Sequence, residues 1–149
     1  MQLTKNFSLE ELTKSETAIR LGISNAPSEE EIKNLHALCE NVLQPLREHY
    51  DLPIVFNSGF RCADVNHRIG GSSTSQHVKG MAADFIIPSI DLKKIYKTIA
   101  DSFEYDQLIY EFGSWIHVSF SAQHNRKQNL IATKNNSVTV YKSYNGEFV

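Results

Sequence analysis

The spacing of apolar residues changes near residue 53, and this change limits the possible folds of the 149-residue chain more than any other feature. Before it, apolar residues recur at intervals of three and four, as on one face of an α-helix, at Ile32, Leu35, Leu38, Val42 and Leu46. After it, short apolar runs are broken by glycine and polar turns, which is typical of strands. Helices early in the chain and antiparallel hairpins late in the chain predict an α+β fold.

Length indicates a single domain over residues 1–149. A chain of this size buries about two-thirds of the surface that it exposes when unfolded, so it needs neither a metal nor a disulfide in order to fold. We expect a helical part over about 1–50, a central core over about 53–120 and a C-terminal hairpin over about 128–149. The helices should pack on a small, mainly antiparallel sheet.

Polar residues mark the ends of the expected helices. Ser8 and Ser28 each precede a glutamate by three residues, which is the spacing of a capping box, so a helix should begin at each serine. Pro45 lies within the long apolar repeat of the main helix and lacks a backbone N–H. It predicts that this helix kinks or restarts near Gln44.

The second half of the chain predicts strands with two short helices between them. The expected elements are a strand at 53–57, a helix at 63–69, a strand at 82–87, a helix around 92–99, strands at 107–112 and 115–120, and a hairpin of 130–134 with 137–142. The turn of the last hairpin is expected at Asn135-Asn136.

Charge and hydropathy exclude two classes of function. With a formal net charge of -2, the chain lacks the excess of lysine and arginine that neutralises nucleic-acid phosphates. No run of residues approaches the roughly 18 apolar residues of a membrane span. Cys39 and Cys62 are too few for a disulfide framework and lack CxxC spacing, so both are expected to be reduced and partly buried.

A carboxylate stands in the middle of an apolar strand, at Asp84 within Met81–Ile87. Burying it is costly unless a positive group or a hydrogen-bond donor pairs with it. A divalent cation, an arginine or a backbone N–H would each meet this need. His77 lies seven residues earlier, and Gly80 between them allows the chain to turn.

A second histidine points away from the expected core. Period-two alternation puts His117 on one face with Trp115 and Ser119, opposite the apolar residues. Two imidazoles and one carboxylate are the three protein ligands of a catalytic zinc, with a fourth position for water. Iron in such a site is the chemical rival, and it predicts an oxygenase with a small-molecule cosubstrate. The remaining histidines are expected to be solvated or merely packed: His36, His49, His67 and His124.

These motifs resemble the family of zinc D-Ala-D-Ala carboxypeptidases and dipeptidases, which includes peptidoglycan-cleaving phage endolysins and vancomycin-resistance dipeptidases. The most specific block is S-x-H-x-x-G-x-A-x-D over 75–84, followed by W-x-H over 115–117. S-G-F-R-C over 58–62 and N-x-x-I-G-G over 66–71 look like the smaller, single-domain members. The resemblance spans about residues 53–120, and the tail beyond it carries no family motif.

The resemblance implies one zinc ion per chain, held on the sheet by His77, Asp84 and His117. It implies a metallopeptidase that hydrolyses D-amino-acid-containing peptides of bacterial peptidoglycan, by metal-activated water with a carboxylate general base. D-Ala-D-Ala carboxypeptidase and stem-peptide endopeptidase activity both remain open. The resemblance also implies that Arg61 binds a substrate carboxylate and that Ser75 contacts substrate. A salt bridge that stabilises the turn and a solvated hydroxyl are the alternatives for these two residues.

The general base departs from the family pattern. A carboxylate often lies three residues before the last histidine, where this chain has Ser114. Glu111 is the first candidate and Asp106 the reserve. A three-residue connection over 112–114 would pair Glu111 with Trp115 and put it on the face of the last histidine. A two-residue turn would direct Glu111 away and favour Asp106, and a solvated strand carboxylate is the plain alternative for Glu111.

Because Ser114 stands where the family often has a carboxylate, a second function remains open. It is that of a catalytically inactive, zinc-containing module that recognises the cell wall. For either function we expect a monomer that binds peptidoglycan stem peptides, binds no nucleic acid and does not insert into a membrane. The N-terminus lacks the apolar stretch of a signal peptide. We therefore expect synthesis in the cytoplasm and access to the wall after lysis or with a helper such as a phage holin.

Overall fold

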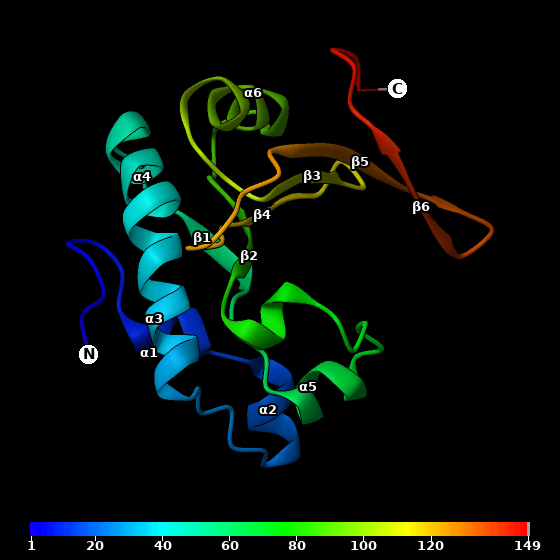
Figure 1. Ribbon diagram of the computed structural model, residues 1–149. Coiled ribbons are helices and arrows are strands. Elements are labelled where there is room, and N and C mark those ends of the chain that lie inside the picture. Colours follow the sequence, from blue (N-terminus) through cyan, green and yellow to red (C-terminus); the bar gives the residue numbers. More distant parts are fainter. Residues whose placement is uncertain (149) are drawn as a thin grey trace.

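The chain forms a six-stranded sheet with helices around it in the computed structural model, which describes residues 1–148 (Figure 1). The strands are β1 (Val55–Ser58), β2 (Ala82–Ile86), β3 (Gln107–Glu111), β4 (Trp115–Ser119), β5 (Gln128–Asn135) and β6 (Val138–Ser143). Their order in the sheet is β1-β2-β4-β3-β5-β6, and neighbours are antiparallel except β3 and β5, which are parallel. The predicted α+β fold with a mainly antiparallel sheet is confirmed.

The helical segments are concentrated in the first third of the chain, as predicted. They are α1 (Leu9–Thr13), α2 (Glu16–Leu21), α3 (Glu29–Leu38), the π-helical turn η1 (Cys39–Leu43), α4 (Gln44–Tyr50), α5 (Ala63–Arg68), the 3-10 turn η2 (Gln76–Lys79) and α6 (Leu92–Ser102). Ser28 and Glu31 form a reciprocal capping box at the start of α3. The Ser8 side chain likewise accepts a hydrogen bond from the backbone N–H of Glu11. Both predicted helix starts are therefore confirmed.

Pro45 is accommodated by the π-helical turn that precedes it. The backbone N–H of Gln44 bonds to the carbonyl of Cys39, five residues earlier, and α4 then begins at Gln44. Pro45 lies in the first turn of α4, where a missing N–H costs least. The predicted restart near Gln44 is confirmed, and the helix axis continues from α3 to α4 by widening one turn.

The core joins α3, α4 and α6 to one face of the sheet. In Figure 1, α6 lies on one side of β3 and β4, and α5 with the turn before β2 lies on the other side. Ile116 and Val118 of β4 are fully buried in the core, so the alternating residues of β4 face the opposite side. Fully buried members of the core include Leu35, Leu38, Val42, Leu46, Phe85, Ile95, Tyr96, Ile99 and Leu108.

The C-terminal hairpin turns one residue later than predicted. Asn135 pairs with Val138, so the turn residues are Asn136 and Ser137 rather than Asn135-Asn136. Both turn residues have positive φ, 50° and 68°, as a two-residue type I′ turn requires. Strand β5 also begins earlier than expected, at Gln128, because it pairs in parallel with β3.

Both cysteines are free within residues 1–148, with Cys39 buried and Cys62 half-buried. Among the described helices, none has the length and apolarity needed to span a bilayer.

Gly80 ends the turn η2, and replacing it by alanine should destabilise the fold more than the same change at Gly22. Both glycines have positive φ, 73° and 66°, which costs a side-chain-bearing residue about 1 kcal/mol. An added Cβ at Gly80 would also lie 2.5 Å from the backbone carbonyl oxygen of Glu31, whereas nothing lies within 4 Å of one at Gly22. We expect Gly80→Ala to cost at least about 1 kcal/mol more than Gly22→Ala, because the backbone of α3 must move. Urea denaturation measures both free energies of unfolding, and equal losses would contradict the prediction.

Candidate metal centre

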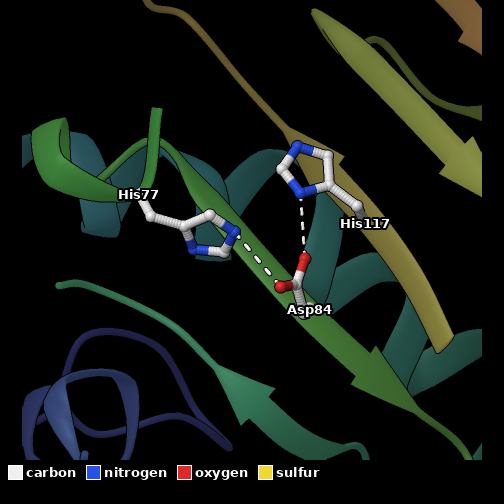
Figure 2. A group of neighbouring side chains, drawn as sticks. All are labelled: His77, Asp84 and His117. Carbon is white, nitrogen blue, oxygen red and sulfur yellow. Dashed lines mark hydrogen bonds and ion pairs between the residues drawn. The ribbon is translucent and has the colours of Figure 1, made fainter. Parts of the chain in front are cut away.

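Three segments bring His77, Asp84 and His117 together (Figure 2). His77 lies in η2, just before β2, and Asp84 lies directly opposite His117 in the β2–β4 pairing. One ligand atom from each residue lies within 4.8 Å of the other two, and the residues are 3%, 9% and 8% exposed. Zinc bonds of about 2.0–2.2 Å to nitrogen and oxygen fit donor atoms at such separations.

The orientation of His77 is set by a backbone carbonyl. Its Nδ1 lies 2.8 Å from the carbonyl oxygen of Gly59. A carbonyl only accepts, so Nδ1 carries the ring hydrogen and donates it. Burial lowers the pKa of His77, although Asp84 opposes this shift, and the imidazole is neutral at pH 7. Its Nε2 therefore presents a lone pair, 3.3 Å from Oδ2 of Asp84.

A lone pair that faces a carboxylate at this distance calls for a cation between them. Burial by itself would raise the pKa of Asp84, but the adjacent imidazoles of His77 and His117 hold it below its ordinary value. The second carboxylate oxygen lies 2.9 Å from Nδ1 of His117. Two imidazole nitrogens thus converge on one buried, ionised carboxylate, and a carbonyl fixes the tautomer of one of them. Zinc sites use such ligands, and a ligating histidine there usually donates its other ring N–H to a carbonyl or carboxylate, as His77 does to Gly59.

Polar atoms without a partner gather around this cluster. Buried side-chain atoms with no hydrogen bond within residues 1–148 include Nε2 of His117, Nε1 of Trp115 and Nε of Arg61. All three residues line one cleft of about 860 Å³. Native structures leave few buried polar atoms unpaired, so these atoms are available to a ligand in the cleft.

The cleft lies between the segment from α5 to η2 and the face of the sheet that carries His117. Arg61 and Ser75 contribute to the wall opposite the strands. The Arg61 guanidinium donates long hydrogen bonds of 3.4 Å to Oγ of Ser58 and of Ser75. Burial lowers the pKa of Arg61, and the charges of Asp84 and Glu111 oppose this shift. No carboxylate of the described chain forms a salt bridge with Arg61, so its charge is available to a ligand.

The connection between β3 and β4 has three residues, and this length determines the face of the sheet on which Glu111 lies. Glu111 pairs with Trp115 and Ile109 pairs with His117, so Glu111 is on the same face of the sheet as His117. Phe112 and Gly113 adopt positive φ of 57° and 66° in this connection. Glu111 is half-buried and lines the cleft, and burial raises its pKa while His117 opposes the shift.

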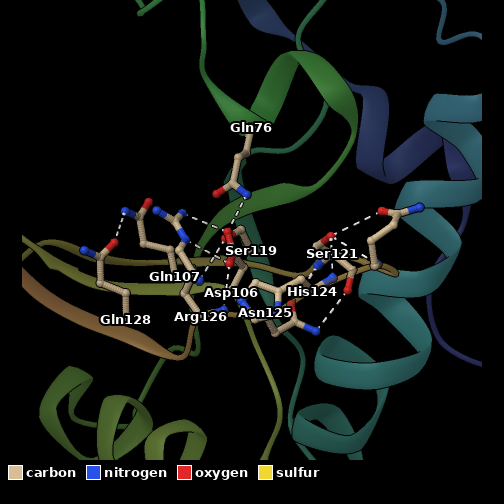
Figure 3. A network of polar contacts seen from close by, with 10 residues as sticks. Gln76, Asp106, Gln107, Ser119, Ser121, His124, Asn125, Arg126 and Gln128 are labelled. Carbon is tan, nitrogen blue, oxygen red and sulfur yellow. Dashed lines mark hydrogen bonds and ion pairs between the residues drawn. The ribbon is translucent and has the colours of Figure 1, made fainter.

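Asp106 does not line the cleft, and its oxygens are occupied by structural contacts (Figure 3). Arg126 donates to both carboxylate oxygens, from Nε at 3.0 Å and Nη2 at 2.8 Å, and its backbone N–H donates at 2.9 Å. The side chain of Gln76 donates a fourth bond at 2.8 Å. The Arg126 bonds lower the pKa of Asp106 to about 2. Asp106 thus ties the turn that carries His77 to the start of β3, whereas Glu111 lines the cleft.

Part of the cleft was not anticipated from the sequence. Its distant end is lined by residues of β3, β5 and β6, among them Gln107, Leu130, Lys134, Thr139 and Tyr141. No motif marks them, and alternation along β5 and β6 would have indicated them only once the pairing of β5 with β3 was known. The other four histidines are exposed, as predicted: His36, His49, His67 and His124.

Replacing Asp106 by asparagine should destabilise the protein at neutral pH, because the charged bonds to Arg126 are lost. We expect a loss of only about 1–2 kcal/mol, because Arg126 is half-exposed and solvent partly screens its charge. The pKa of Asp106 is lowered in the fold, so its contribution is present above the ordinary pKa of about 4 and is lost as pH falls towards 2. Urea denaturation between pH 7 and pH 2.5 should show the difference between Asp106→Asn and wild type shrinking. Asp64→Asn is the control, since Asp64 and Arg68 form an exposed pair that contributes less than about 0.5 kcal/mol. A difference that does not change with pH would contradict the assignment.

Comparison with known families agrees with this geometry. The model of the peptidase M15 family matches residues 5–119, which include His77, Asp84 and His117. No individually curated protein matches the chain significantly. M15 peptidases depend on zinc, and the family implies a metallopeptidase for peptidoglycan-type substrates. The chain belongs to the peptidase M15 family, that of the zinc D-Ala-D-Ala carboxypeptidases, and the resemblance seen in its motifs is confirmed.

Proposed function

We propose that the protein is a zinc peptidase that hydrolyses D-amino-acid-containing peptides of bacterial peptidoglycan. The observation that carries the proposal is the buried cluster in which Nε2 of His77 and Nδ1 of His117 both face the carboxylate of Asp84. His77 Nε2, the Asp84 carboxylate and His117 Nδ1 would hold one zinc ion per chain. When bound, zinc activates water and polarises the peptide carbonyl.

Glu111 is the proposed general base. Within the described part of the cleft, the acidic lining residues are Asp84 and Glu111, and Asp84 belongs to the metal cluster. Burial raises the pKa of Glu111, which brings a carboxylate closer to the value that suits proton transfer near neutral pH. Glu111 would take the proton from the attacking water and deliver it to the leaving amine. Glu111 on β3 thus replaces the carboxylate that the family often places where this chain has Ser114.

Arg61 and Ser75 would bind the substrate on the other wall. The guanidinium of Arg61 has a buried Nε without a partner and makes only long bonds to serine hydroxyls. A substrate carboxylate could accept from two of its N–H groups at once. Ser75 lies two residues before His77 and holds the backbone N–H of His77 through its hydroxyl, at 3.2 Å. Ser75 could therefore contact the substrate and also help to position His77.

A catalytically inactive module that binds zinc and recognises the cell wall is the second candidate. The observation in its favour is Ser114, which stands where the family often has a carboxylate. The two candidates agree on the metal cluster and differ only in whether Glu111 performs proton transfer.

Replacing Glu111 by glutamine should leave zinc bound and lower the rate of muropeptide cleavage by about 100-fold or more, because glutamine cannot accept the proton. Metal content is measured by elemental analysis, and cleavage by chromatography of soluble products. Glu48→Gln is a matched control, since Glu48 is exposed on α4 and does not line the cleft. Cleavage by Glu111→Gln at the wild-type rate would exclude Glu111 as the base. No cleavage by zinc-replete wild type would favour the recognition module.

Removing the metal should abolish cleavage while the protein stays folded. The fully buried apolar core involves both helices and sheet, so folding does not depend on the cluster. After chelation we expect the far-UV circular dichroism of the holo protein, and zinc should restore cleavage. Metal analysis of protein purified without added metal should find zinc and no iron. Unfolding on chelation would instead assign the cluster a structural role, and bound iron would favour the oxygenase.

Mass spectrometry of products from purified peptidoglycan, with and without chelator, should identify the bond. Chelator-sensitive release of D-Ala would indicate a carboxypeptidase, and release of an internal fragment an endopeptidase. A product pattern unaffected by the chelator would contradict zinc-dependent hydrolysis.

A further inference from the structure

The face of the sheet that carries the metal cluster continues onto the C-terminal hairpin. Ile109 of β3 pairs with His117 on one side and with Leu130 of β5 on the other. Lys134 of β5 pairs in turn with Thr139 of β6. Side chains directly opposite each other share a face, so one surface runs from Asp84 on β2 to β6. The match to the family model ends at residue 119, so β5 and β6 are an addition to the matched region.

This added surface belongs to the same cleft as the cluster. Residues of β5 and β6, including Leu130, Lys134 and Tyr141, line the cleft together with His77 and His117. Tyr141 is 54% exposed and lines the cleft, and burial and the charges of Glu111 and Asp84 raise its pKa. Because Ala132 lies between Glu111 and Tyr141 in the strand pairing, no large side chain of β5 separates the two.

The hairpin surface has the composition of a peptide-binding wall. The side chains of Gln107 and Gln128 bond to each other at 2.9 Å and present amide groups. Leu130 adds an apolar contact. The ammonium of Lys134 lies 5.3 Å from the ring centre of Phe112, and no described carboxylate pairs with it. Amides, an apolar side chain, a phenol and an unpaired cation together suit an extended peptide that carries a carboxylate.

The order of the strands gives such a peptide a direction. Arg61 follows β1 at one side of the cluster, and the hairpin lies on the other side, beyond β3. If Arg61 holds the C-terminal carboxylate, a peptide that extends away from Arg61 along the cleft runs over β3, β5 and β6. Three strand spacings of about 4.8 Å give roughly 14 Å, which is about four residues of extended peptide.

We infer that the β5–β6 hairpin is a substrate-binding wall that selects long peptides over dipeptides. Lys134 pairs with a carboxylate on the N-terminal part of the peptide, and Tyr141 packs against the backbone of this part. The inference rests on the proposed peptidase function and extends it to the class of substrate: stem peptides of about four residues or more, bearing an acidic group.

The test compares Tyr141→Ala and Lys134→Ala with wild type on two zinc-dependent reactions. The substrates are the dipeptide D-Ala-D-Ala and a stem pentapeptide that contains glutamate and ends in D-Ala-D-Ala. We expect each variant to lower kcat/KM for the pentapeptide by about 10-fold and to leave that for the dipeptide within about two-fold. Val140→Ala is the matched control, because Val140 directly precedes Tyr141 on β6, is 41% exposed and does not line the cleft. Equal losses on both substrates, or an equal loss in Val140→Ala, would overturn the inference.

A binding measurement separates failure of the inference from failure of the proposed function. If wild type cleaves neither peptide, the peptidase function fails, and calorimetry of the pentapeptide with the zinc-loaded protein still tests the wall. Tyr141→Ala and Lys134→Ala should then weaken binding by about 10-fold, and Val140→Ala should not. Unchanged affinity in both variants, or no binding by wild type, would overturn the inference.

Discussion

The burial of one charged carboxylate, that of Asp84, is the constraint on which the metal cluster and its surroundings depend. Asp84 stands at the centre of a strand whose neighbours are core residues, and water is almost excluded from it. Such a group is tolerated only if its charge is met by strong partners. The fold places His117 opposite it across the β2–β4 pairing and brings His77 over it from the preceding turn. A cation between these groups would satisfy the carboxylate and the lone pair of His77 together.

The position of His77 depends on parts of the chain that carry no metal ligand. Its ring is oriented by the carbonyl of Gly59, and a Cβ at Gly59 would overlap the backbone of Leu12 in α1. The next residue, Phe60, donates its backbone N–H to the carbonyl of that leucine. On the other side, Gln76 is held by Asp106. Helix α1 and the residue before β3 therefore both help to position His77, and both lie within the family-matched residues.

A sheet offers a continuous surface because strand pairing carries one face from strand to strand. Here one face packs into the core and the other holds the cluster, Glu111 and the hairpin residues that line the cleft. The parallel pairing of β5 with β3 lets the C-terminal segment extend this surface without disturbing the β2–β4 pair. The metal cluster and Glu111 lie within the family-matched residues, whereas the part of the cleft wall formed by β5 and β6 lies after them.

Local sequence was enough to determine the helix caps at Ser8 and Ser28, the restart at Gln44 and the His77, Asp84 and His117 set, because each depends on near neighbours or on a motif. The face of Glu111 was not determined by sequence, since it depends on whether the β3–β4 connection has two or three residues, and one residue reverses every side chain. The structural role of Asp106 and the hairpin wall of the cleft were decided by contacts with Arg126 and with β3, far away in the chain. Short-range patterns predicted most of the elements, and the motifs pointed to the residues of the cluster. Only tertiary pairing decides which distant side chains share a face, because that pairing is not encoded by any local period.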